Sequence, residues 1–101
     1  MDYKVEWSPK AVSDLAERVS FLAKASKEAA KELSDSVISM GESLSSLPER
    51  FQEFPMPSSF PVTIRKCVIN HRYIILCGVK GESVIIYRVL DARRNLGGLL
   101  S

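Results

Sequence analysis

The residues of this chain best suited to chemistry are arginines, and they are concentrated toward one end. Arg65, Arg72, Arg88, Arg93 and Arg94 all lie in the C-terminal segment. A guanidinium group stays charged at all relevant pH values, binds phosphate or carboxylate through two hydrogen bonds and stacks on aromatic rings. These residues therefore suit an anionic ligand. The alternative is that some of them pair with carboxylates of the same chain on a solvated surface.

The charge of the chain is divided unevenly along its length. Residues 1–61 carry 7 Lys/Arg and 10 Asp/Glu, a net charge of −3, whereas residues 62–101 carry 7 and 2, a net charge of +5. Because charge of one sign attracts partners of the other, we expect one surface that meets an anionic partner and another that meets a cationic one.

Other groups that support catalysis or metal binding are scarce. His71 is the only histidine, so a catalytic triad has no second imidazole to draw on, and at a predicted turn it is at most a lone general base. Cys67 and Cys77 are too few for a zinc site and are expected to be reduced and buried. Tyr73 and Tyr87 have rings that stack on bases, although aromatic residues of strands belong more often to the core. We expect no metal, no cofactor and no small-molecule substrate.

Length and composition are those of one small globular domain. The chain has 101 residues, of which 46% are hydrophobic and 26% charged. The longest apolar run, Tyr73 to Val79, is far shorter than the roughly 20 residues that a membrane span needs, and the first residues do not form a signal peptide. We expect a single domain over residues 1–101, cytoplasmic and without a membrane partner.

Two helices joined by a short link are predicted in the first half of the chain. Ser8 and Pro9 form a helix-start signal, with a hydroxyl to cap the first turn and a ring where no amide donor is needed. Ser26 is a second N-cap, and Pro48 marks the expected end of the second helix. The apolar stripes are Val12, Leu15, Val19 and Leu22 in the first helix, and Ala30, Leu33, Val37, Met40, Leu44 and Leu47 in the second. Their spacing predicts an antiparallel helical hairpin.

The remaining segments are predicted to be strands and connections. Tyr3–Trp7 alternates apolar and charged residues, as a strand with one buried face does. Residues 49–61 are rich in proline and serine and are expected to form a long surface connection without a core face. Residues 62–69, 72–79 and 83–90 are rich in β-branched residues and separated by turn signals, so they are predicted to form three antiparallel strands. The middle one is apolar at consecutive positions and should be central in the sheet.

This order predicts an α+β domain in which an N-terminal strand and a helical hairpin precede three antiparallel strands. The helices are expected to pack on one face of the sheet. The other face has no predicted helix to cover it, so solvent, the C-terminal tail or a partner must meet it.

Several of these features together resemble a known superfamily. Trp7-Ser8-Pro9-Lys10-Ala11 is followed by Asp14-Leu15, Pro48 closes the hairpin, Tyr73-Ile74-Ile75-Leu76 forms the central strand, and Arg88 to Asn95 form the C-terminal run. In this order and spacing, over nearly the whole chain, they resemble the RelE/ParE superfamily of bacterial type II toxins. The resemblance implies a β-α-α-β-β-β fold and a cognate antitoxin protein that wraps the toxin and neutralises it.

Two positions distinguish the branches of this superfamily. In the RelE-like, ribosome-dependent mRNA endonucleases an arginine typically follows the leading tyrosine of the third strand, and here Ile74 follows Tyr73. Those nucleases also have a His or Tyr near the C-terminus, and none occurs here after Tyr87. The run Asp91-Ala92-Arg93-Arg94 is similar to the His-x-x-Arg-like run of the ParE branch, with Asp in place of histidine. The resemblance therefore implies a ParE-like toxin that binds and poisons DNA gyrase without catalysis.

Three functional hypotheses follow: a gyrase-binding toxin, an endonuclease acting on mRNA at the ribosome, and a degenerate member that only binds its antitoxin. For target binding we predict Arg65, Arg72, Tyr73, Arg88, Arg93 and Arg94. For antitoxin binding we predict Leu15, Val19, Leu22, Arg65 and Arg88. The residues that a nuclease would use are Arg65, Lys66, Arg88 and Arg94, with His71 or Tyr73 as substitutes for the missing groups.

Overall fold

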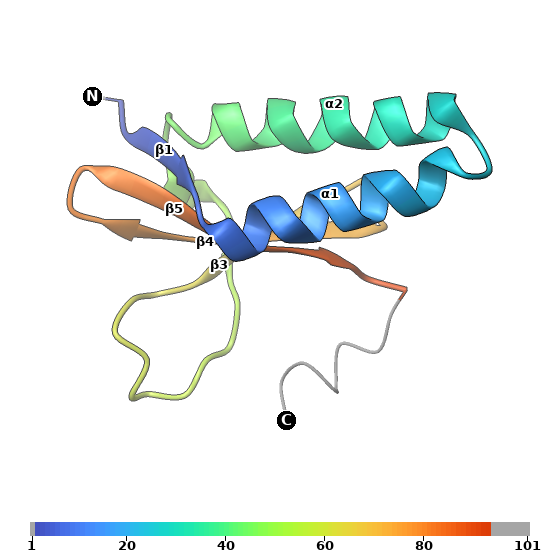
Figure 1. Cartoon of the computed structure of the whole chain (residues 1–101). Helices are drawn as coiled ribbons and strands as arrows, with labels where there is room; N and C mark the ends of the chain where they lie inside the picture. The colour runs from blue at the N-terminus through green and yellow to red at the C-terminus, as the bar shows by residue number, and fades with distance from the viewer. Residues whose placement is uncertain (1, 94–101) are drawn as a thin grey trace.

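The computed structural model, which describes residues 2–93, has two helices packed on a five-stranded sheet (Figure 1). Its elements are β1 (Lys4–Trp7), α1 (Pro9–Ala23), α2 (Lys27–Ser43), a 3₁₀ turn (Pro48–Arg50), β2 (Gln52–Glu53), β3 (Arg65–Ile69), β4 (Tyr73–Lys80) and β5 (Ser83–Asp91). The α+β class and the order of the predicted elements are confirmed, with β2 as an addition.

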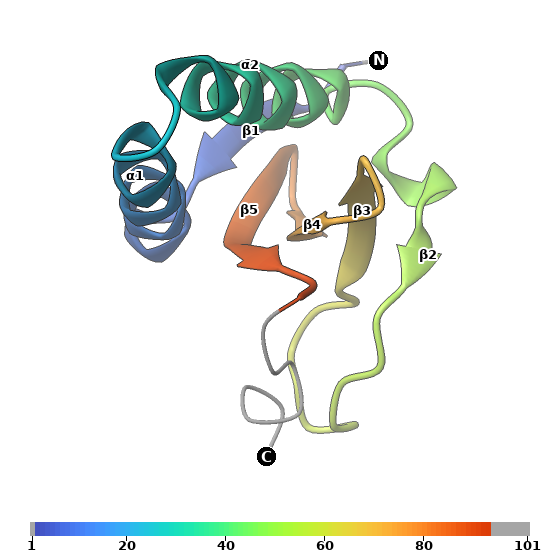
Figure 2. The same ribbon diagram turned by 90° about the vertical axis from the view of Figure 1, so that its right-hand side faces the viewer.

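The sheet joins the first strand of the chain to the last. Its order is β1-β5-β4-β3-β2, in which β1 runs parallel to β5 and all other neighbours are antiparallel. Strand β4 lies in the centre and is buried over its first six residues, as its continuous apolar sequence predicted. Figure 2 shows both helices on the same side of this sheet. The parallel pair therefore ties the N-terminal segment directly to the C-terminal strand.

Both helices begin where their caps predicted. The Ser8 hydroxyl accepts a hydrogen bond from the Ala11 amide at 3.0 Å, with Pro9 at the first helical position. The Ser26 hydroxyl accepts from the Ala29 amide at 3.1 Å. In each case the cap satisfies an amide that has no partner within its own helix.

The end of α2 differs from the prediction. The helix stops at Ser43, and Leu47, which was assigned to its apolar stripe, is 73% exposed with a φ of 46°. Pro48 explains why Leu47 is not helical, because the ring of a proline disfavours the helical conformation in the residue before it. Leu44 is the last residue of the stripe to be buried.

The expected surface connection takes part in the sheet and in a second core. Gln52–Glu53 pairs with β3, and the Phe54 amide donates a hydrogen bond to the Ile64 carbonyl at 2.7 Å. Phe54 and Met56 pack on the sheet face opposite the helices. The prediction that this segment lacks a core face was wrong, because its apolar residues fall between prolines at irregular spacing. This segment therefore covers part of the sheet face that we expected solvent, the C-terminal tail or a partner to meet.

The β3–β4 hairpin turns at the predicted Asn70-His71 position, where both residues have positive φ angles. Asn70 and His71 have φ values of 52° and 56°, and the Arg72 amide donates to the Ile69 carbonyl at 3.0 Å. Positive φ at both central residues matches the right-handed twist of the flanking strands, and asparagine tolerates it well. His71 is exposed in this turn, so its imidazole is not part of a buried site.

The two cysteines lie on neighbouring strands in the main core. Cys67 and Cys77 are both free thiols and almost fully buried. A hydrogen bond to Cys77, together with burial, raises the pKa of Cys67 well above its usual range. A thiol that stays protonated is a poor nucleophile. The prediction that both cysteines are buried is confirmed.

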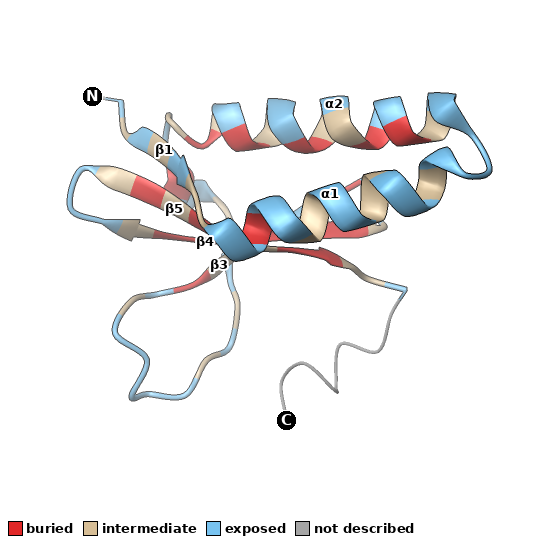
Figure 3. Cartoon of the chain, in the orientation of Figure 1, coloured by how far each residue is buried: buried red, intermediate tan, exposed pale blue. Residues whose placement is uncertain are grey.

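The main core lies between the helical layer and the sheet. Buried residues follow one side of α2, facing the strands (Figure 3). Gly41 lies on this side, and a Cβ at this position would be 2.5 Å from Cζ2 of Trp7 and 3.2 Å from Cδ1 of Ile86. The glycine is needed because the indole of β1 packs directly against the backbone of α2.

Replacing Gly41 with alanine is therefore expected to destabilise the protein, although the same change stabilises an exposed helix by about 1 kcal/mol. Overpacking a rigid core costs about 1–3 kcal/mol, and Trp7 and Ile86 surround the site. The measurement is the free energy of unfolding from urea titration. In a Trp7→Leu background the clash with the indole is gone, so Gly41→Ala should cost less there. An equal cost in both backgrounds would contradict this packing.

Candidate functional site

The helical layer has an apolar groove on its surface, between α1 and α2 and reaching β1. The groove encloses about 460 Å³ and is lined by Trp7, Val12, Leu15, Ala16, Val19, Ser34 and Ile38. Val12 and Ile38 remain 53% and 43% exposed. Exposed apolar surface of this kind is characteristic of a protein interaction site.

The groove contains part of the predicted antitoxin-binding set. Leu15 and Val19 line it, whereas Leu22 lines a separate pocket at the far end of the hairpin. Val12 and Ile38 were not among the predicted antitoxin-binding residues. Ile38 falls outside the buried stripe of α2, and an isoleucine on the polar side of an amphipathic helix is a signal that could have found it.

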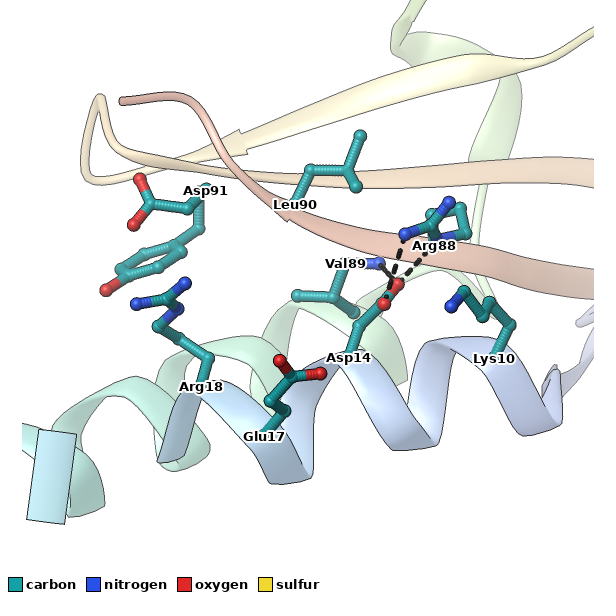
Figure 4. A pocket seen from close by; sticks show the side chains of 9 residues that line it. Lys10, Asp14, Glu17, Arg18, Arg88, Val89, Leu90 and Asp91 are labelled. Atoms are coloured by element: carbon teal, nitrogen blue, oxygen red, sulfur yellow. Dashed lines mark hydrogen bonds and ion pairs between the residues drawn. The ribbon is translucent and has the colours of Figure 1, made fainter. Parts of the chain in front are cut away.

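A second, polar cleft of about 210 Å³ lies between α1 and β5 (Figure 4). On one side of it, Arg88 donates two hydrogen bonds to Asp14, from Nε at 2.7 Å and from Nη2 at 3.2 Å. The Asp14 side chain is 12% exposed and that of Arg88 31%. The hydrogen bonding of Arg88 to Asp14 raises the pKa of Arg88. Lys10, Glu17 and Arg18 also line this cleft and give it charges of both signs.

Asp14 also completes the edge of β5. Strand β1 ends at Trp7, and its pairing with β5 ends at Ile86. Beyond that point the Ser8 hydroxyl donates to the Tyr87 carbonyl at 3.0 Å, and Asp14 accepts from the Val89 amide at 3.0 Å. Buried backbone groups need such partners. The start of α1 therefore takes the place of the missing strand.

Arg88 is thus held by an internal partner. The sequence predicted it for target binding, antitoxin binding and nuclease activity, and in the structure two of its N–H donors bind a helix carboxylate. The alternative that arginines pair within the chain holds at this position. The sequence pattern did not reveal this pairing, because Asp14 lies 74 residues away from Arg88 in the sequence.

The other predicted target-binding residues are spread over the molecule. Arg65 donates to the Phe51 carbonyl at 2.8 Å and fixes the segment before β2. Arg72 lies 3.9 Å from Asp91 and 5.1 Å from the centre of the Tyr73 ring. Tyr73 is only 6% exposed, so its ring belongs to the core and is closed to a stacking partner. Arg93 is exposed at the end of the described chain, and Arg94 lies outside the described residues.

The residues that a nuclease would use are not gathered in one place. Arg65 and Lys66 are consecutive in β3 and so point to opposite faces of the sheet. Lys66 is in register with Leu76, which in turn pairs with Arg88. Leu76 separates the two cations, and Asp14 neutralises Arg88. Arg94 lies outside the described residues.

The sheet face away from the helices has a third, mainly apolar groove of about 230 Å³. It is lined by Phe54, Met56, Phe60, Ile64, Leu76, Tyr87, Arg88 and Leu90. A phosphate backbone requires cations and hydrogen-bond donors around it. Apart from Arg88, which is already paired, this groove offers none from a lysine or an arginine.

Metal sites and membrane-spanning helices are both absent from residues 2–93. No group of three or more His, Cys, Asp or Glu residues is placed to hold a metal ion there. Neither helix of this part of the chain is long and apolar enough to cross a membrane.

Comparison with known proteins agrees with this architecture. A family model described as the ParE toxin of the type II toxin-antitoxin system parDE matches residues 5–96. A structure described as the chromosomal ParDE TA system from P. aeruginosa is similar with a TM-score of 0.69 and 19% identity, covering 88% of this chain and 95% of the other. The solution structure of the conserved hypothetical protein HP0894 from Helicobacter pylori has a TM-score of 0.58 and 17% identity, covering 91% and 97%. No curated protein sequence matches the chain.

The helical hairpin on one face of a mainly antiparallel sheet is the fold of the matched structures, and the family model places the chain among the small toxins of type II toxin-antitoxin systems. The chain belongs to the ParE toxin family. The parDE system implies a cognate antitoxin as its partner. The resemblance seen in the sequence is confirmed at this level.

Proposed function

We propose that this protein arrests growth by binding DNA gyrase, and that its cognate antitoxin neutralises it by packing a helix into the groove between α1 and α2. The observation that carries the antitoxin site is the groove itself, which is apolar, open and rimmed by the exposed Val12 and Ile38. An amphipathic helix binds such a groove through apolar side chains three and four positions apart.

Binding without catalysis is supported by the arrangement of the cations. General acid–base cleavage of RNA needs a positioned base and cations that converge on one phosphate. In the described residues Arg65 is bonded to a backbone carbonyl, Arg88 to Asp14, and Lys66 lies on the opposite face from Arg65. The gyrase target itself rests on membership of the ParE family.

The positive surface around the end of β5 is our candidate contact with gyrase. Arg93 is exposed there, Arg72 is partly exposed nearby, and residues 62–101 carry a net charge of +5. Such a surface attracts an anionic partner and speeds its association.

Purified protein is expected to inhibit supercoiling by gyrase, and Arg93→Glu is expected to raise the concentration needed by about tenfold, because reversing a charge in a complementary interface costs of the order of 1 kcal/mol or more. The control is Lys27→Glu, an equal charge reversal on α2, away from the sheet, which should leave inhibition unchanged. Full supercoiling activity in the presence of excess wild-type protein, together with mRNA cut in a translation extract, would replace this proposal with the endonuclease.

A further inference from the structure

The outer edge of β1 has unpaired backbone groups in a regular pattern. The Lys4 amide donates to the Glu82 carbonyl at 3.0 Å, and the Ser8 amide donates to the Ile86 carbonyl at 2.9 Å. In a parallel pair, residues alternate between pointing both backbone groups inward and both outward. Since Lys4 and Ser8 point toward β5, Val5 and Trp7 point away from it. Figure 1 shows β1 at the border of the sheet, so these groups face a free edge.

The side chains of this strand have a self-complementary order. Tyr3, Val5 and Trp7 pack against the main core, whereas Lys4 and Glu6 are exposed on the other face. The two exposed charges have opposite signs and lie on either side of Val5. No ion pair engages either of them among residues 2–93. Proteins blunt a free strand edge with charged side chains, prolines, bulges or a very short strand. Strand β1 is short, but its two exposed charges have opposite signs and so do not repel a second copy.

We propose that β1 pairs edge to edge with β1 of a second copy of this chain, antiparallel and about a two-fold axis through Val5. In this register Val5 lies opposite Val5 of the second copy, and Lys4 lies opposite Glu6 of the second copy. Because the operation is symmetric, the same pair forms twice. The two sheets then join into one continuous sheet across the axis.

The backbone pattern fits this register without adjustment. Val5 points both its amide and its carbonyl outward, so the two copies exchange two hydrogen bonds at the axis, as a hydrogen-bonded antiparallel pair does. Lys4 and Glu6 then fall at the non-hydrogen-bonded positions, where opposing side chains come closest. The Tyr3 amide is already bonded to the Ser45 carbonyl at 2.8 Å, which ends the pairing at that residue.

The strength of this contact is limited by its length. Only four residues form β1, and a ladder this short buries less surface than the roughly 1,600 Å² of a typical stable interface. We therefore expect a reversible dimer with a Kd on the order of 10–100 µM. The contact lies along the backbone edge of β1, whereas the groove lies between α1 and α2 and includes the Trp7 side chain of β1.

Charge reversal tests the register directly. Lys4→Glu sets two carboxylates against each other in both symmetric pairs, and Glu6→Lys sets two ammonium groups against each other in the same places. Each single variant is expected to dimerise at least about tenfold more weakly than the wild type in sedimentation equilibrium between ~10 and ~500 µM. The two variants mixed at equal concentration should form a heterodimer, because every opposing pair is then of opposite sign. The double exchange Lys4→Glu/Glu6→Lys should restore the homodimer.

The controls separate this contact from loss of folding and from other occupants of the edge. Lys27→Glu and Glu28→Lys reverse exposed charges on α2 and should dimerise as the wild type does, and all variants should keep the wild-type Tm within a few degrees. A wild-type chain that stays monomeric over the whole range overturns the proposal. So does a dimer that survives either single reversal, and so does a mixture that fails to associate.

Discussion

Replacing Asp14 with alanine is expected to lower the free energy of unfolding by about 2–4 kcal/mol. The carboxylate accepts three hydrogen bonds, two from Arg88 and one from the Val89 amide, and is 12% exposed. Loss of the carboxylate leaves the Arg88 guanidinium and the Val89 amide without this partner. A polar group that loses its partner in a partly buried place costs more free energy than a hydrogen bond between exposed groups contributes. Urea titration followed by circular dichroism measures the change.

An exposed ion pair of the same kind supplies the control. Lys31 and Asp35 are 2.8 Å apart on α2, with side chains 78% and 64% exposed. Asp35→Ala should change the stability by less than about 1 kcal/mol, because exposed pairs contribute little. A double-mutant cycle of Asp14→Ala with Arg88→Met then isolates this partly buried pair, for which we expect a coupling of about 1 kcal/mol or more. A cost for Asp14→Ala no larger than that of the control would show that α1 is not fastened to β5 in this way.

Introducing a charge into the groove between α1 and α2 is expected to weaken antitoxin binding by about 100-fold. The variant is Val12→Asp combined with Ile38→Asp, at two positions that are 53% and 43% exposed, so the free protein tolerates both changes. An antitoxin helix seated there would have to bury two carboxylates without partners, which costs several kcal/mol. Isothermal titration calorimetry with the purified antitoxin measures the affinity, and loss of growth rescue on coexpression is the cellular readout.

The matched control for this change is Val68→Asp. Val68 is 47% exposed on β3, so the substitution makes the same chemical change as Val12→Asp, at similar exposure but outside the groove. Antitoxin affinity should remain within about threefold of the wild type. If Val68→Asp weakens binding as strongly as the groove variant, the antitoxin uses the sheet and not the helical hairpin as its main contact.

Most of the fold could be predicted from the sequence because helix caps and turns depend on residues that are close together in the chain. The Ser8 and Ser26 caps act within one helical turn, and the Asn70-His71 turn joins adjacent strands. The segment after Pro48 was mispredicted because its anchors, among them Phe54 and Met56, follow neither a helical nor a strand period. What positions them is the sheet face they cover, and that face is assembled from distant parts of the chain.

The candidate site was only partly predictable for the same reason. Leu15 and Val19 were found through helical periodicity, and they line the groove. The periodicity did not show that the hairpin leaves this groove open. Arg88 appeared to be a free cation, since its partner Asp14 comes from the other end of the chain. Charge alone indicates which residues attract anions, whereas only the folded structure shows which charges are already neutralised.

The parallel pairing of the first strand with the last has a mechanical consequence. The start of β1 and the end of β5 lie at opposite ends of their shared ladder, because the two strands run in the same direction. Force applied to the two termini therefore loads all of these hydrogen bonds at once, in shear, whereas force on a hairpin opens its bonds one after another. Forced unfolding depends on this barrier and not on equilibrium stability. A pull on both termini therefore meets this ladder before it reaches the helices.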